Sequence, residues 1–122
     1  MLKYNKRKRV WSYSVNFKKR LENIFNFYKK LYKLTTKLEF TNYLEDSFYD
    51  IEQDKIRTFL PLKFQRLKKL AFHSLYHEIK HAIDFYDNPK KIIKEIKSGN
   101  PNIERRAIYF SEKKVGAKYK LL

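Results

Sequence analysis

The chain has 122 residues, 43% of them hydrophobic and 17% aromatic, and a formal net charge of +16, which suits one domain with one apolar core. This composition excludes an intrinsically disordered chain, and because no apolar run approaches the ~20 residues of a membrane-spanning helix, we expect no membrane contact. The absence of Cys excludes disulfides and thiolate metal sites.

The first segment of the chain is strongly basic. Residues 1–33 hold eight Lys and three Arg against one acid, Glu22. We expect residues 1–15 to form a basic N-terminal arm, disordered or with a short strand at Val10–Val15, before a domain over residues 16–122. The stretch after the basic start is too short and too polar for a signal peptide, which predicts a cytoplasmic protein.

This clustered charge has two interpretations. A basic surface attracts phosphates at low salt, which predicts a nucleic-acid contact through residues 1–33. The competing interpretation starts from composition, because 22 Lys against 7 Arg is typical of an A+T-rich coding sequence in which Lys fills solvated positions. We favour the second interpretation.

The first helix is predicted to begin after Asn16, a favoured N-cap residue. Apolar residues recur at three- and four-residue spacing with Lys and Arg between them, which is typical of a helix with one apolar face. That face consists of Phe17, Leu21, Ile24, Phe25, Tyr28, Leu31 and Tyr32.

Strands are predicted between Thr35 and Leu60, where the hydrophobic period changes to two. Leu38 and Phe40 alternate with polar residues, and residues 56–60 do so again. The polar triplet at 52–54 predicts a hairpin turn between strands at Phe48–Ile51 and Lys55–Phe59. Pro61 then ends the last strand.

Helical periodicity returns from Leu62 to about Asp87. Its broad face comprises Leu67, Leu70, Ala71, Ser74, Leu75, Glu78, Ile79, Ala82 and Ile83. Asn88-Pro89 breaks this helix, a short Lys-rich piece follows at Lys90–Lys97, and Asn100-Pro101 starts a final helix that should stop at Gly116. This order predicts a single small α+β domain: an N-terminal helix, two to three strands in an antiparallel or mixed sheet, a long helix and a C-terminal helix.

The long helix contains an H-E-x-x-H motif at residues 77–81. Residues four apart share a helix face, so the imidazoles of His77 and His81 can bind one ion. Glu78 lies about 100° round the helix, where its carboxylate can reach a metal-bound water without being a ligand. Zinc lowers the pKa of such a water to ~7, and Glu78 can then take its proton as the water attacks a carbonyl.

A catalytic zinc site needs a third protein ligand and one open position. Three acids are candidates: Glu104 in the first turn of the next helix, Asp87, and Asp84, of which we favour Glu104. Asp84 shares the face of both histidines and suits a supporting role, in which it accepts a hydrogen bond from a ligand imidazole or another site group.

The sequence His77-Glu-Ile-Lys-His-Ala-Ile-Asp84, followed by Glu104-Arg-Arg-Ala107, resembles the zincin metallopeptidases of the gluzincin branch. The nearest likenesses are compact forms of the ImmA/IrrE type and small phage-encoded zincins. The resemblance implies a zincin-like domain with Zn²⁺ held by two His of one helix and a Glu of a following helix. It also implies that the last strand before the motif, Lys55–Phe59, is a sheet edge that holds the peptide.

The chain departs from the family pattern in three places. Larger gluzincins place an Asp four residues after the ligand Glu, where this chain has Ile108. Lys80 occupies a position that is often small, and we expect its side chain to point to solvent. No residue matches the Tyr or His that stabilises the oxyanion in the family; Tyr109, Arg105 and Arg106 are the candidates.

Two other interpretations concern the histidines themselves. In the first, the helix lies on the surface, His77 and His81 are solvated, and Glu78 pairs with Lys80 or Arg66. In the second, His73 and His77 form a rival metal pair, but His73 lacks a Glu at the right offset. We therefore expect His73 to flank the site or to make a hydrogen bond.

The leading hypothesis is a zinc-dependent metallopeptidase that acts on a protein or peptide substrate in the cytoplasm, with Glu78 as the general base. For a phage-encoded protein, the compartment would be the host cytoplasm or the virion. The alternative is a basic nucleic-acid-associated or virion structural protein with a non-catalytic zincin fold. Neither the substrate nor the oligomeric state can be read from the residues.

Overall fold

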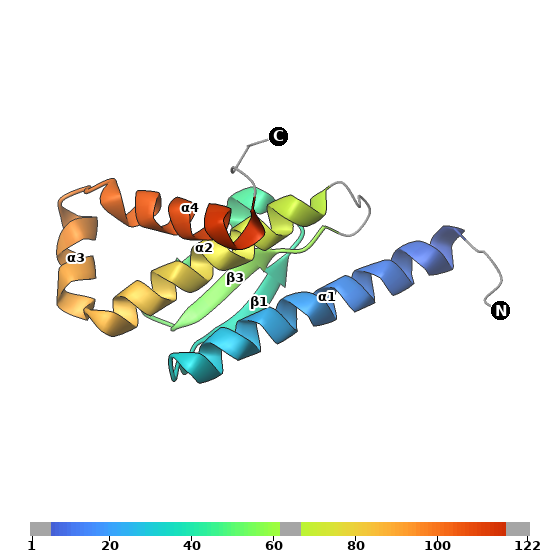
Figure 1. Cartoon of the computed structure of the whole chain (residues 1–122), viewed down its shortest axis with the longest axis horizontal. Coiled ribbons are helices and arrows are strands. Elements are labelled where there is room, and N and C mark those ends of the chain that lie inside the picture. Colours follow the sequence, from blue (N-terminus) through green and yellow to red (C-terminus); the bar gives the residue numbers. More distant parts are fainter. Residues whose placement is uncertain (1–5, 62–66, 117–122) are drawn as a thin grey trace.

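The computed structural model describes the chain over residues 6–61 and 67–116, with side chains described from residue 16 onward. In these residues the fold is α+β, with four α-helices and a mixed sheet of three strands, as the sequence predicts (Figure 1). The elements are α1 (Lys6–Leu31), β1 (Lys37–Thr41), the short 3₁₀ helix η1 (Leu44–Asp46), β2 (Phe48–Asp50), β3 (Lys55–Phe59), α2 (Lys68–Asp87), α3 (Pro89–Lys97) and α4 (Asn102–Val115).

Helix α1 begins earlier than the sequence pattern indicates. It starts at Lys6, so the predicted N-cap at Asn16 and the predicted strand at Val10–Val15 are wrong. The residues before Asn16 include no Gly or Pro, and their Lys and Arg favour helix, so nothing interrupts the backbone hydrogen bonds there. The helix therefore runs through the boundary that we expected between the basic arm and the domain.

The sheet has the strand order β1-β3-β2. β3 pairs in parallel with β1, Ile56 opposite Leu38, and antiparallel with β2, Ile56 opposite Tyr49. The expectation that Lys55–Phe59 forms a sheet edge is therefore wrong, because this strand is central and both of its sides are paired. β2 is the edge strand on the side where the hairpin turn returns the chain.

The turn before β3 depends on Asp54, whose φ of +51° lies in the left-handed region. Asp and Asn tolerate this conformation better than most residues. The Asp54 carboxylate also accepts hydrogen bonds from four hydroxyl groups, those of Thr35, Thr36, Tyr49 and Tyr86. This carboxylate thereby joins the start of β1, the edge strand and the end of α2.

Helix α2 lies between the strands and α4 and contacts both (Figure 1). Its buried face closes one core with Ile56 of β3 and Leu21 of α1, both fully buried together with Leu75 and Ile79. The predicted face of the long helix is confirmed from Leu70 to Ile83, whereas residues 62–66, which we expected in the same helix, lie outside the described residues.

The predicted helix boundaries near the C-terminus are confirmed to within one residue. α2 ends before Asn88, whose side chain accepts a hydrogen bond from the backbone N–H of Lys91 (3.2 Å) as α3 begins at Pro89. The Asn100 side chain accepts from the N–H of Asn102 (2.9 Å) at the start of α4. α4 ends at Gly116, whose φ of +76° is the left-handed C-cap conformation that glycine adopts without strain. With these boundaries, the chain returns so that the first turn of α4 lies against the middle of α2.

Candidate metal centre

The two motif histidines lie one turn apart on the side of α2 that faces α4. Their rings meet edge to face with centroids 4.7 Å apart. His77 and His81 are mostly buried, with side chains 17% and 13% exposed. The alternative in which both imidazoles are solvated on a surface helix is therefore wrong.

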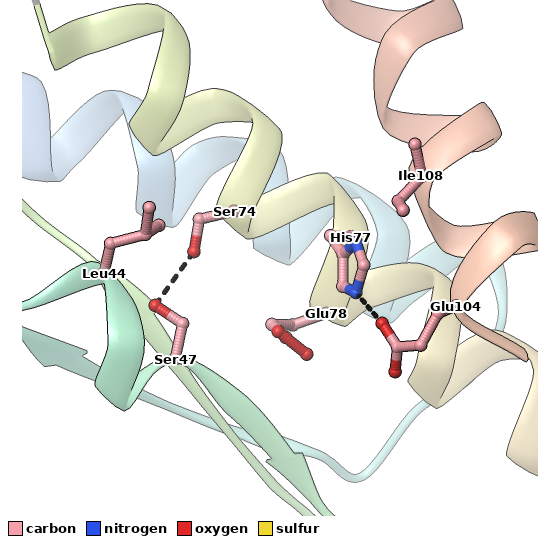
Figure 2. Close-up of a pocket in the computed structure, with 7 residues that line it drawn as sticks. All are labelled: Leu44, Ser47, Ser74, His77, Glu78, Glu104 and Ile108. Atoms are coloured by element: carbon pink, nitrogen blue, oxygen red, sulfur yellow. Dashed lines mark hydrogen bonds and ion pairs between the residues drawn. The ribbon is translucent and has the colours of Figure 1, made fainter. Parts of the chain in front are cut away.

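Glu104, from the first turn of α4, reaches both imidazoles, and Figure 2 shows its contact with His77. Its Oε2 lies 2.7 Å from Nε2 of His77, and its Oε1 lies 3.1 Å from Nε2 of His81. These contacts hold the pKa of the Glu104 carboxyl far below its usual range, chiefly through hydrogen bonds from His77 and then His81. Of the three acids proposed as a third ligand, Glu104 contacts both histidines, whereas Asp87 lies exposed at the end of α2.

The side chains that meet here are of types that zinc binds. Two imidazole nitrogens and a carboxylate oxygen are common zinc ligands, and in a tetrahedral site with bonds of about 2.0–2.1 Å such donors lie about 3.3 Å apart. The distances of 2.7 and 3.1 Å are shorter and join the histidines to two different oxygens of Glu104, so a bound ion would require the exposed Glu104 side chain to shift. Ligand atoms of His77, Glu78 and His81 also lie within 4.8 Å of one another.

Glu78 is the buried acid of the site. Only 6% of the residue is exposed, and burial raises the pKa of its carboxyl to about 7, with His77 lowering it and Glu104 raising it. The carboxyl lines a cavity of about 270 Å³ that His77, Glu104 and Ile108 also line. A carboxyl with a pKa near 7 can accept and release a proton near neutral pH.

The structure also places a group of hydroxyls opposite the histidines, which the sequence did not predict. The Ser74 hydroxyl donates to Ser47 (3.1 Å), lies 3.2 Å from the Thr58 hydroxyl, and accepts from the N–H of Phe59 (3.3 Å). Figure 2 shows Glu78 between this serine pair and the His77–Glu104 pair. The only sequence signal was Ser74, a polar residue on the predicted buried face one turn before Glu78.

Among the described contacts, Asp84 bonds two cations and not the imidazole of His77 or His81. Its Oδ1 lies 2.9 Å from Lys80 Nζ, and its Oδ2 accepts from Arg106 Nε (3.3 Å). Arg106 also donates two hydrogen bonds to Glu95 of α3, at 2.8 and 3.0 Å. The expectation that Lys80 points to solvent is wrong, because the i,i+4 spacing places it against Asp84, and its side chain is 26% exposed.

The structure does not bring His73 or Tyr109 to the candidate metal ligands. His73 is buried and its Nδ1 lies 3.2 Å from the hydroxyl of Ser111, which confirms the expected hydrogen bond and ties α2 to α4. Tyr109 is 60% exposed with Lys113 over its ring, and it does not line the cavity. Its position five residues after Glu104 turns it about 140° away round the helix, whereas Ile108 at four residues stays on the same face.

Comparison of the chain with family models, with curated protein sequences and with solved structures finds no match. The resemblance to zincins, the zinc ion and the cytoplasmic location therefore stay predictions. Within residues 6–61 and 67–116, no helix combines the length and the apolar character needed to cross a membrane.

Proposed function

We propose that this protein is a zinc-dependent metallopeptidase of the zincin type, in which His77, His81 and Glu104 hold the ion and Glu78 is the general base. The observation that carries the proposal is the contact of both carboxylate oxygens of Glu104 with the Nε2 atoms of the two histidines. The gluzincin pattern in the sequence requires an acid from a following helix to meet the two histidines. Histidines solvated on a surface helix would need no such acid.

In the proposed reaction, the ion and Glu78 have different roles. When bound, zinc supplies a Lewis acid that lowers the pKa of water to about 7 and polarises a carbonyl group. Glu78 lines the same cavity, so its carboxylate accepts the proton of the attacking water and afterwards delivers it to the leaving nitrogen.

The substrate-binding face is proposed to be the side of the cavity formed by η1 and the start of β2. Leu44 and Ser47 line the cavity there, opposite His77 and Glu104 (Figure 2). The Ser47 hydroxyl accepts from Ser74 and keeps its own proton to donate, which suits it to hydrogen-bond a peptide carbonyl.

The test combines metal content with hydrolysis of a fluorogenic peptide library. Wild type should bind one equivalent of zinc and cleave peptides; H77A should lose both properties; E78Q should keep the zinc and lose at least about 100-fold in rate. E52Q, which removes an exposed acid from the hairpin turn, is the matched control and should behave as wild type. A wild type without stoichiometric zinc, or an E78Q variant as active as wild type, would refute the proposal.

A second candidate function is contact with nucleic acid through residues 1–33. It is supported by Lys18, Lys19 and Arg20, which are exposed at three successive positions of α1. Binding of a DNA duplex should weaken steeply with salt, and K18E/K19E should weaken it further. Equal binding by this variant and wild type would dismiss the candidate.

A further inference from the structure

A second cavity, of about 130 Å³, adjoins the metal centre and has a different lining. His81 and Glu104 form one end of it, so it begins where the first cavity, lined by His77 and Glu104, ends. The remaining wall is mainly apolar and includes four isoleucines from three separate segments, namely Ile51, Ile92, Ile96 and Ile103.

The walls of this cavity are fixed by contacts outside it. Tyr49 completes the lining, and its hydroxyl donates to Asp54 (2.9 Å), which anchors the ring at the edge strand. Arg106 of α4 binds Glu95 of α3 through two hydrogen bonds and also bonds Asp84 of α2, so the three helices around the cavity are held together by one side chain. A cavity held in this way is formed before any ligand enters it.

Charge at the cavity rim does not favour a basic ligand. Asp84 is the lining acid besides Glu104, and its two oxygens are already engaged by Lys80 and Arg106. The Glu104 oxygens face the two imidazoles. With both carboxylates engaged, the four isoleucines set the chemistry of the cavity.

We propose that this cavity binds an apolar side chain, between Leu and Phe in size, of a peptide whose backbone lies at the metal centre. The inference rests on the proposed function for the presence of a peptide and on the cavity for the side chain. An apolar cavity of about 150 Å³ holds benzene, so a slightly smaller cavity of about 130 Å³ suits a side chain of about that size or a little smaller. Ile92 and Ile96, one turn apart on α3, are the residues that determine this preference.

The first arm of the test needs neither zinc nor catalysis. The metal-free full chain, labelled at isoleucine methyl groups, is titrated with N-acetyl-leucine amide, N-acetyl-glycine amide and N-acetyl-arginine amide. The leucine probe should shift the methyl signals of Ile51, Ile92, Ile96 and Ile103, and the other two probes should not. Absence of these shifts, or equal or larger shifts with the glycine or arginine probe, would overturn the inference.

A matched pair of variants locates the effect on α3. Ile96 lines the cavity and is 52% exposed, and Ile93 on the same helix is 41% exposed and does not line it, so both tolerate a polar residue. I96N should weaken leucine-probe binding at least about fivefold, whereas I93N should match wild type. Unchanged binding by I96N would overturn the inference.

The second arm links the cavity to the metal. In zinc-loaded protein, leucine hydroxamate should bind about tenfold more tightly than glycine hydroxamate, because the isobutyl group leaves water. Equal affinities on a zinc-loaded protein would overturn the inference while the proposed zinc site stands. A chain that binds no zinc but shows the methyl shifts would instead refute the proposed function and support the apolar side-chain site.

Discussion

The Glu104 carboxylate lies 2.7 Å from Nε2 of His77, although 27 positions separate the two residues in the chain. The intervening segment ends α2, forms α3 and turns at Asn100 before α4 begins. The ligand set therefore depends on how α4 packs against α2, and a change in either helix boundary would move the carboxylate away from the imidazoles.

The first prediction concerns the third ligand. E104Q should lower zinc affinity at least about 100-fold, since even partners outside the ligand shell affect affinity about 10–100-fold. The Glu104 side chain is 62% exposed, so the fold should survive, and circular dichroism checks this. Zinc affinity is measured by competition with a chelator, with E52Q as the control. Wild-type affinity in E104Q would remove Glu104 from the ligand set.

The second prediction compares two neighbouring arginines on α4. R106A leaves the mostly buried carboxylates of Asp84 and Glu95 without their shared cation, which is strongly destabilising. We expect the thermal midpoint to fall by at least about 4 °C, whereas R105A, which removes an exposed guanidinium of equal charge, should shift it by less than about 2 °C. Calorimetry measures both midpoints. Equal shifts would show that Arg106 does not join the helices.

The third prediction concerns acid stability at the hairpin turn. Burial raises the pKa of Asp54, but hydrogen bonds from Tyr86, Thr36, Thr35 and Tyr49 lower it more, so the folded-state pKa lies below its ordinary value. The resulting stabilisation is fully present above the unfolded-chain pKa of about 3.9 and is lost as the pH falls through the lower folded-state value.

D54N tests this expectation without straining the turn, because Asn also tolerates a positive φ. Urea unfolding should show D54N less stable than wild type at pH 7, and the difference should shrink below about pH 4. E52Q, in the same turn, should show no comparable change with pH. A difference between D54N and wild type that is the same at pH 7 and pH 3 would contradict the role of the Asp54 charge.

The fourth prediction concerns the core beneath the site. Leu75 is fully buried between the sheet and the helices, so L75A should lower the free energy of unfolding by about 2–5 kcal/mol. L31A, which truncates a leucine that is 58% exposed at the end of α1, should change it by less than about 0.5 kcal/mol. Denaturant titrations measure both. A loss in L75A as small as that in L31A would contradict the described core.

Local patterns predicted much of the fold because they act within one or two turns of chain. The 3.6 period placed Ser74, Leu75 and Glu78 on the buried face of α2, and the Asn100 and Gly116 signals set the ends of α4. These features require only near neighbours, which the sequence displays. The ligand spacing of His77 and His81 belongs to the same class, since one helical turn fixes it.

Most features that depend on distant segments were not predicted, and the approach of Glu104 to the two histidines is the exception. β3 is central because it pairs with both β1 and β2. The alternation of polar and apolar residues in Lys55–Phe59 indicates a strand but not its place in the sheet. Tyr109 was a candidate because it lies near Glu104 in the chain, but the helix turns it to solvent. The partners of Arg106 lie 11 and 22 positions away on two other helices, so no local spacing indicates them.

The direct contact of Glu104 with both imidazoles has a consequence for how an ion would be taken up. The donors are already gathered in the absence of metal, so the loss of conformational entropy needed to gather them is incurred when the chain folds. Capture would then require little movement of the backbone. Such a preorganised site should load zinc faster than a site that must first fold around the ion.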